Sequence, residues 1–355
     1  MASFFPVKFI IKKFLIIVTC IVLLITSNNL YSSEGSIEDF GIISIMYHRF
    51  EENKYPSTNI KIRDFLNHLQ LIEKENVEYI NPKNFINDLR NKRGQRKLLL
   101  TIDDGFTSFY DNAWPILKQR KIPFILFVST REIGKSGYMS WEQIKELSNH
   151  NFVEIGNHSH SHEYLVDENI NEIRNDITKS KNILKKNLNR NSVFFSYPFG
   201  EYSLEFKNLI KQLDFQFAFG QHSGVIGNSE DLFELPRYPI NEKYGKLERF
   251  STLLKTIPFS YESITPLEKY INNKTNPPDV TVKFSNSIKN IRSINCFSNE
   301  ENKWRTSKIN FINDYEIKII LDGKFTTERG RINCSLREQG GFFRWLGMQF
   351  VVAEK

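Results

Sequence analysis

The sequence has no internal repeat and no long low-complexity tract, and its lysines form no cluster. Of its 355 residues 40% are hydrophobic and 25% are charged, a composition typical of globular domains. The formal net charge is +7. Because the positive charge is spread along the chain, the pattern disfavours a nucleic-acid-binding protein. It predicts a solvated basic surface with affinity for anionic surfaces or polymers.

Cysteine is scarce, with three residues in the chain. Cys20 lies within an apolar N-terminal stretch directly behind Thr19, which makes a poor lipoprotein cleavage site. Cys296 and Cys334 lie close to the C-terminal end of the sequence. In an oxidising compartment these two would pair, and two buried free thiols are the alternative.

Long apolar runs are also missing. Three lysines precede the stretch Phe14–Ile25, whose length suits the core of a signal peptide better than a full membrane span. No Ala-x-Ala cleavage pattern follows it. We therefore expect residues 1–33 to be a signal peptide, with an uncleaved membrane anchor as the alternative. In either case the remainder is exported, as a periplasmic or a secreted protein.

The stretch Leu98–Phe106 ends an apolar run in two adjacent carboxylates and a glycine. The run fits a strand buried on both faces, as in a parallel sheet. Burial of two neighbouring carboxylates is costly unless a metal or a proton offsets their charge. We therefore expect Asp103 and Asp104 at the carboxyl end of a strand, where α/β folds place their chemistry. A strand followed by an ordinary Asp-Gly turn is the alternative.

Three of the seven histidines, His158, His160 and His162, lie in one short segment. Neutral imidazole is the commonest metal ligand in proteins, and residues four apart share one face of a helical turn. Three histidines and a carboxylate exceed what one divalent ion with an open position needs. The spacing indicates that His160 is the histidine that does not bind the ion. A solvated, histidine-rich loop is the alternative.

A third stretch, Phe194–Tyr202, is an apolar run broken by a proline and a glycine, so backbone amides there could be exposed. Together the three stretches resemble the polysaccharide deacetylase family, also called the NodB-homology or carbohydrate esterase 4 group. Thr101–Gly105 is similar to its first motif, His158–His162 to its second, and Tyr197–Gly200 to the core of its third. The motifs occur in the family's order, and the resemblance spans about residues 40 to 260.

The resemblance implies an α/β fold, an irregular (β/α) barrel over residues 38–263 with its site at the carboxyl ends of the strands. Strands that alternate with helices agree with a mainly parallel sheet, but the pattern alone does not separate an open sheet from a barrel. By resemblance Asp104, His158 and His162 would bind a divalent metal, zinc or a similar ion. Asp103 would be the general base.

Two residues are expected to replace family features that are missing. The late Leu-His motif is absent because no histidine follows His222, which we read as structural. In the poly-N-acetylglucosamine deacetylase branch an early Tyr-His takes that role, so His48 is expected to be the general acid. Ser196 stands where the third motif often has arginine. Arg237, in a Leu-Pro-Arg segment, would then orient Asp103, with a surface arginine as the alternative.

Other contacts are expected near the third motif. The amide of Phe199 would add an oxyanion contact, and Tyr197 and Pro198 would bind substrate. Trp141 would line a sugar site, with core packing as the alternative. The family's fourth motif, an Asp and Trp pair, is not recognisable.

The residue pattern of the C-terminal part of the sequence differs from that of the preceding part. Residues 264–278 are polar and read as a linker. Residues 279–355 contain short β-type runs that predict a small antiparallel β-sandwich domain without catalytic groups, which helps to hold the polymer. Trp304, Phe342, Phe343 and Trp345 would form a sugar-stacking surface there, or else belong to its core.

The sequence therefore predicts an exported, metal-dependent N-deacetylase whose substrate is an acetylated polysaccharide containing N-acetylglucosamine. The alternatives are an O-acetyl esterase acting on a wall polymer or exopolysaccharide and a catalytically silent polysaccharide-binding protein. No nucleic-acid partner is expected, and a membrane is involved only through an uncleaved N-terminal segment. The oligomeric state is not indicated.

Overall fold

The computed structural model describes residues 40–90, 95–285 and 288–353. The expected signal peptide, residues 1–33, lies outside the described residues. Within the described ranges, no helix combines the length and the hydropathy needed to cross a membrane.

The first sheet is mainly parallel, as the alternation of strands and helices predicted. Its core strands β1, β5 and β6 consist of buried residues along their whole length, because apolar side chains cover both faces. Only β10 pairs antiparallel, with β1. The strand order is β10 (Val225–Ile226), β1 (Ile42–Tyr47), β5 (Lys97–Ile102), β6 (Phe124–Val128), β7 (Val153–Asn157), β8 (Phe194–Ser196) and β9 (Phe217–Phe219), with β4 (Glu78–Tyr79) beside β5 and β11 (Tyr238–Pro239) beside β1.

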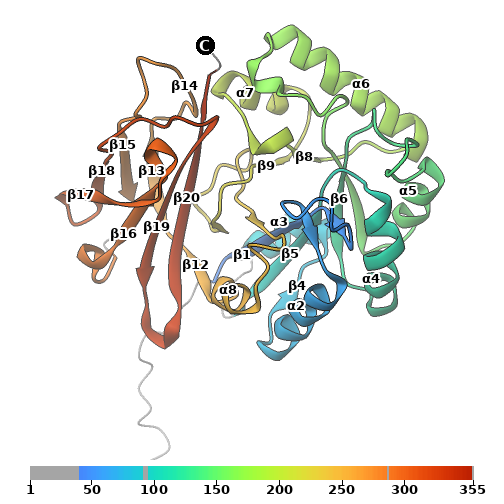
Figure 1. Ribbon diagram of the computed structural model, residues 1–355, viewed down its shortest axis with the longest axis horizontal. Coiled ribbons are helices and arrows are strands. Elements are labelled where there is room, and N and C mark those ends of the chain that lie inside the picture. The colour runs from blue at the N-terminus through green and yellow to red at the C-terminus, as the bar shows by residue number, and fades with distance from the viewer. Residues whose placement is uncertain (1–39, 91–94, 286–287, 354–355) are drawn as a thin grey trace, which may run out of the picture. The chain divides into compact units, whose positions relative to one another are not determined.

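Helices cover the outer side of this sheet, and Figure 1 shows α4, α5 and α6 along one flank. Helix α5 begins at the expected capping box, in which the side chain of Ser140 accepts from Gln143 N and the side chain of Gln143 accepts from Ser140 N. The helices are α2 (Ile62–Lys74), α3 (Phe85–Arg90), α4 (Trp114–Arg120), α5 (Trp141–Ser148), α6 (Ile170–Leu188), α7 (Leu204–Gln212) and α8 (Leu247–Leu253).

The first sheet curls, so that the segment after β9 approaches the strands at the other edge. Leu235 forms a parallel bridge with Phe219 of β9, and Arg237 N donates a hydrogen bond to the carbonyl of His222. The same segment continues into β11, which pairs with β1. This mixed α/β arrangement with a curled sheet is consistent with the barrel that the family resemblance implied.

The second sheet is mostly antiparallel, with β12 and β14 parallel to β20. Strand β17 pairs with β16 through its first residues and with β18 through the rest, so it joins two parts of the sheet around a separate apolar core. The strands are β12 (Thr256–Pro258), β13 (Tyr261–Thr265), β14 (Tyr270–Ile271), β15 (Val280–Phe284), β16 (Asn295–Ser298), β17 (Arg305–Asn313), β18 (Glu316–Ile320), β19 (Arg329–Arg337) and β20 (Phe343–Val352).

The segment 264–278, expected as a linker, contains the end of β13 and all of β14. Both strands pair within the second sheet. Only Ile264 and Thr265 of β13 fall in this segment, and every residue of β13 is exposed or half-buried. We call residues 40–254 the first region and residues 255–353 the second region.

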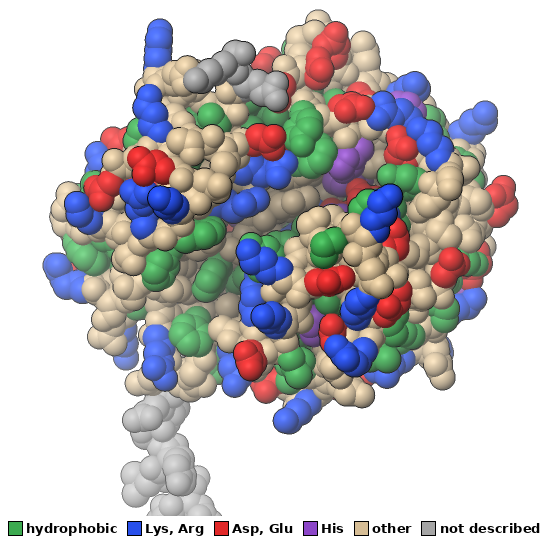
Figure 2. Space-filling view, in the orientation of Figure 1, with side chains coloured by type: hydrophobic (Ala, Val, Ile, Leu, Met, Phe, Trp, Pro, Cys, Tyr) green, Lys and Arg blue, Asp and Glu red, His purple; other side chains and the backbone are tan. Residues whose placement is uncertain are grey.

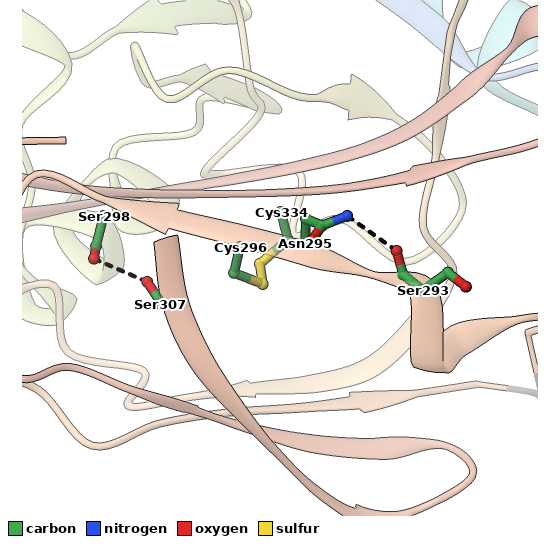
Figure 3. The surroundings of a disulfide bond; sticks show 6 residues. All are labelled: Ser293, Asn295, Cys296, Ser298, Ser307 and Cys334. Atoms are coloured by element: carbon green, nitrogen blue, oxygen red, sulfur yellow. Dashed lines mark hydrogen bonds between the residues drawn. A yellow bond between two sulfur atoms is a disulfide. The ribbon is translucent and has the colours of Figure 1, made fainter. Parts of the chain in front are cut away.

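Cys296 and Cys334 form a disulfide, so the choice that the sequence left open is decided in favour of pairing (Figure 3). The two residues lie directly opposite each other on β16 and β19. Both are buried in the core of the second region. The bond closes a sequence separation of 38 residues.

The two regions share hydrogen bonds and a β-bridge. Trp345 Nε1 donates to Ser223 Oγ at 2.9 Å, and Leu346 forms an antiparallel bridge with Gly224. Gln349 Nε2 donates to the carbonyl of Gly200, next to the third motif, at 3.3 Å. Strand β20 is thus attached to the loops of the first region.

Candidate metal centre and active site

The predicted site residues Asp103, Asp104 and His158 lie at the carboxyl ends of strands of the first sheet. Asp103 and Asp104 follow β5, His158 follows β7, and Ser196 ends β8. Because these strands are parallel, their carboxyl ends lie at one edge of the sheet.

Asp104, His158 and His162 place one donor atom each within 4.8 Å of the others. Asp104 Oδ1 lies 3.5 Å from His158 Nε2 and 3.3 Å from His162 Nε2. No described residue donates a hydrogen bond to this buried Asp104 oxygen. An orphaned buried carboxylate oxygen facing two imidazole nitrogens is the environment that a divalent cation completes, so these residues fit a metal ion.

His158 is held in the state that a metal ligand needs. Its Nδ1 donates a hydrogen bond to the carbonyl of Ser196 at 2.7 Å, which leaves the lone pair on Nε2, facing Asp104. Burial lowers the pKa of His158 to about 4, although the nearby carboxylate of Asp103 acts in the opposite direction. The imidazole is therefore neutral at physiological pH.

Left-handed backbone conformations gather at this site. The φ angles are 75° at Asp104, 68° at Ser159, 54° at His162 and 58° at Phe199. Side chains other than glycine rarely adopt this region, and such strain is found where the surrounding structure fixes a functional geometry. Local sequence propensity alone would not place these side chains where they are.

His160 points away from the metal centre, as its spacing predicted. Its Nδ1 lies 2.9 Å from Thr130 Oγ1. The carboxylate of Asp176 on α6 accepts from the backbone N–H groups of His160 and Ser161, at 2.7 and 3.0 Å. These bonds fix the loop so that the two flanking histidines turn inward and His160 turns outward.

Asp103 and Arg237 form a fully buried ion pair. Arg237 Nη1 lies 2.7 Å from Asp103 Oδ1 and Nη2 lies 2.9 Å from Oδ2, which is a bidentate geometry. Burial by itself would raise the pKa of Asp103, but Arg237, His158 and His48 outweigh it and lower that pKa to about 2. Asp103 is therefore ionised at neutral pH, and Arg237 is not a surface arginine.

Ser196 has a role that the sequence did not reveal. Its Oγ accepts from Arg237 Nη2 at 2.7 Å, and its carbonyl accepts from His158. Thr101 Oγ1 also accepts from Arg237, at 3.2 Å. The sequence showed Ser196 only as a missing arginine, because nothing local indicates that an arginine from a distant segment reaches this place.

His48 follows β1, and β1 pairs with β5 so that Tyr47 lies opposite Ile102. His48 therefore emerges beside Asp103, and its influence on the pKa of Asp103 agrees with that position. His48 also lines the cleft described next. The adjacency of the two strands is confirmed, while the catalytic role of His48 stays a prediction.

A cleft of about 1220 Å³ contains the site. The first region contributes His48, Asp104, His162 and Phe199 to its wall, and the second region contributes residues of β19 and β20, among them Trp345. Figure 2 shows a hollow with Lys, Arg and His side chains around it. The second region therefore forms part of the cleft wall, and Trp345, one of the aromatic residues assigned from the sequence to a sugar-stacking surface or a core, lines this cleft.

Three residues expected to contact substrate lie elsewhere. Tyr197 is 0% exposed, and its hydroxyl donates to the carbonyl of Phe233 within an apolar cluster. Pro198 is buried beside it. Trp141, the first residue of α5, packs against the main core and is not part of the cleft wall. The apolar surface of these side chains is used for packing, so their expected substrate contacts are not found.

Residues 90–218 match the model of the polysaccharide deacetylase family. The poly-beta-1,6-N-acetyl-D-glucosamine N-deacetylase of Staphylococcus epidermidis is 24% identical over 233 residues, which cover 62% of this chain and 77% of that protein. The enzyme of the same name from Staphylococcus aureus (strain MRSA252) is 24% identical over 193 residues, which cover 50% of this chain and 66% of that protein.

Solved structures show the same fold. The Streptococcus pyogenes deacetylase PplD in complex with acetate matches with a TM-score of 0.55 and 22% identity, covering 61% of this chain and 99% of that chain. IcaB from Ammonifex degensii matches with a TM-score of 0.54 and 24% identity, covering 61% of this chain and 98% of that chain. The chain thus shares the fold of these deacetylase structures, and residues 90–218, which carry the three motifs, are similar to the polysaccharide deacetylase family.

Proposed function

We propose that this protein is an exported, metal-dependent polysaccharide N-deacetylase that removes acetyl groups from N-acetylglucosamine units. The observation that carries the proposal is the convergence of Asp104, His158 and His162 around an orphaned carboxylate oxygen. The buried Asp103–Arg237 pair lies directly beside them, with Asp103 Oδ2 3.7 Å from His158 Nε2. The N-terminal sequence pattern supports export.

The metal would be held by Asp104, His158 and His162, and zinc suits one carboxylate and two imidazoles. When bound, such an ion supplies Lewis acidity toward a water molecule and the acetyl carbonyl. Asp103 acts as the general base and accepts the proton of the attacking water. Its bidentate bonds to Arg237 keep it ionised and fix its orientation.

The departing amine needs a proton, because an unprotonated amine is a poor leaving group. His48 supplies it from the cleft wall beside Asp103. The backbone N–H of Phe199, held in a left-handed turn at the edge of the cleft, adds a hydrogen bond to the developing oxyanion. The acid, the base and the oxyanion contact thus come from three different strand ends.

The test measures acetate release from N-acetylated and O-acetylated oligosaccharides by purified protein, with and without a chelator. We expect release from the N-acetylated substrates, loss of it on chelation, and recovery on adding Zn²⁺. Preference for the O-acetylated substrates would point to an esterase. Absence of release from every substrate by the metal-loaded protein would point to a silent binding protein.

Variants of the histidine segment make the test specific to the proposed ligands. His158→Ala or His162→Ala should abolish binding of one Zn²⁺ per chain, measured by calorimetry. His160→Ala is the matched control, because its side chain faces Thr130 instead of Asp104. Equal loss of zinc in all three variants would contradict the ligand assignment.

A further inference from the structure

Strand β19 presents a polar face to the cleft. Arg329, Arg331 and Asn333 line the cleft. Ile332 and Cys334, which alternate with them along the strand, are buried in the core of the second region. This alternation is that of a strand with one face packed and the other open. The open face of β19 is therefore a wall of the active-site cleft.

Two ring contacts connect this wall to the metal centre. The rings of His162 and Phe199 have centroids 4.8 Å apart. The guanidinium carbon of Arg329 lies 5.5 Å from the centroid of the Phe199 ring. Arg331 follows on the same face of β19, about 7 Å further along the strand. A polymer with one sugar at the metal centre would pass this part of the wall.

Arg331 forms no ion pair with a carboxylate of the described residues, although Glu201 lies near enough to act on its pKa. Arg329, by contrast, forms an ion pair with the buried Glu201. The contact of the Arg331 side chain is a weak hydrogen bond from Nε to Gln349 Oε1 at 3.4 Å. Burial, together with the charge of Arg329, lowers the pKa of Arg331. A half-buried guanidinium in this situation is stabilised by an incoming anion.

Arg249, on α8 of the first region, is in the same situation. It lines the cleft, donates to the carbonyl of Tyr244 at 2.6 Å and forms no ion pair with a described residue. Its guanidinium carbon lies 5.1 Å from the centroid of the Tyr244 ring. Tyr244 also contributes to the pKa of Arg331, so both arginines lie near one tyrosine. Two regions thus bring two unpaired cations to one part of the cleft.

The other arginines of the cleft wall form ion pairs. Arg131 pairs with Glu132 and Glu163, and Arg49 pairs with Glu52. The excess of positive charge along the described wall is therefore local to Arg331 and Arg249. Local charge of this kind raises the concentration of an oppositely charged ligand and orients it.

We propose that Arg331 and Arg249 form an anion subsite that binds a carboxylate or phosphate group of the polymer, so that the substrate is an acidic polysaccharide. Guanidinium groups are suited to both anions because their planar donors form paired hydrogen bonds. The proposal rests on the proposed function, since it concerns the same cleft. It goes beyond that function in naming the charge of the substrate.

The test compares three probes: neutral chitopentaose, chitopentaose carrying a 6-phosphate, and a hyaluronan hexasaccharide, whose alternate sugars carry carboxylates. For the full metal-loaded chain we expect kcat/KM for acetate release to be at least about tenfold higher for one acidic probe than for the neutral one. Which acidic probe is preferred identifies the anion. Added salt should lower the ratio of kcat/KM for the acidic probe to kcat/KM for the neutral probe.

Arg331→Gln or Arg249→Gln should each reduce this acidic-to-neutral ratio about tenfold. Arg337→Gln is the matched control, because Arg337 lies on the same strand but is exposed and outside the cleft wall, and it should keep the ratio. Equal kcat/KM for all three probes, or an equal fall for all probes in the Arg331 variant, would overturn the subsite.

A binding measurement separates this proposal from the proposed function. Calorimetry with the acidic probes requires no turnover, so it reports on the subsite even if no acetate is released. Tighter binding of an acidic probe by the unmodified chain than by Arg331→Gln supports the subsite. Equal binding refutes it, whatever the catalytic result.

Discussion

The two regions of this protein differ in how their functional residues can be recognised. In the first region the site consists of residue types that metal and acid–base chemistry require at fixed spacing, such as the Asp103–Asp104 pair. In the second region the cleft wall is made of Arg331 and its neighbours, which belong to no motif. The comparison teaches that chemistry leaves a local pattern in the sequence, whereas the shape and charge of a cleft need not.

Fully buried and half-buried charges differ in whether they are paired within the protein. Asp103 and Arg237 are both 0% exposed, and each has the other as its partner. Arg331 is only half-buried and has no carboxylate partner among the described residues. A fully buried charge must be paired within the protein, because removing its partner costs about 3–5 kcal/mol. A partly solvated charge can stay unpaired and remain available to a ligand.

The largest effect is expected in the first region. His48→Ala should lower kcat by about 10² to 10⁴ while the affinity for Zn²⁺ is kept, because His48 is proposed to protonate the amine and binds no metal. The variant should also lose the fall in rate at alkaline pH, since a general acid must be protonated to act. Rate measurements across pH and zinc calorimetry check both. Near-normal kcat would exclude the role and leave the buried His222 as the next candidate.

A smaller effect is expected from the second region. Replacing Cys296 and Cys334 together by serine removes a cross-link that spans 38 residues in sequence. Because the unfolded chain then gains conformational freedom, the free energy of unfolding of this region should fall by about 4 kcal/mol. Urea unfolding under oxidising conditions measures it, with reduced unmodified protein for comparison.

The same disulfide variant shows how independent the two regions are. Because the metal ligands all lie in the first region, zinc affinity should stay close to that of the unmodified chain. If zinc affinity falls together with stability, the regions unfold as one unit. The expectation of a separate C-terminal domain would then fail.

The smallest effect is a decrease in the free energy of unfolding at acid pH, caused by His68 in the core of the first region. The hydroxyl of Tyr47 donates to His68 Nδ1 at 2.9 Å, and His68 Nε2 donates to the carbonyl of Gly245 at 2.6 Å. Burial lowers the pKa of His68 from 6.5 to about 4. The unfolded chain therefore binds the proton more tightly, so stability that is complete above pH 6.5 is lost as the pH falls toward 4.

For His68 this loss amounts to about 3 kcal/mol. Chemical unfolding at a series of pH values should show it as a decline toward acid pH. In His68→Gln the decline should be shallower, because one of the buried neutral histidines is gone. An unchanged slope in that variant would show that other groups carry the dependence.

Much of the first region could be predicted because its signals are local. The apolar run before Asp103 predicted β5, and the capping pattern at Ser140 predicted the start of α5. The spacing of His160 predicted that its side chain would not face the proposed metal ligands. The predictions for Tyr197 and Trp141 failed for the opposite reason. An aromatic side chain looks the same in sequence whether it packs in a core or faces a sugar, and only its neighbours decide.

The sequence by itself determined which residues we expect to hold a metal and move a proton, because few residue types perform that chemistry and their spacing is constrained. It also determined the parallel sheet, through buried apolar strands that alternate with helices. Only the tertiary structure decided that Arg237 reaches Asp103, that Ser196 orients His158, and that β19 forms part of the cleft wall. These contacts join segments far apart in the chain, so they depend on strand order and packing and leave no local pattern to read.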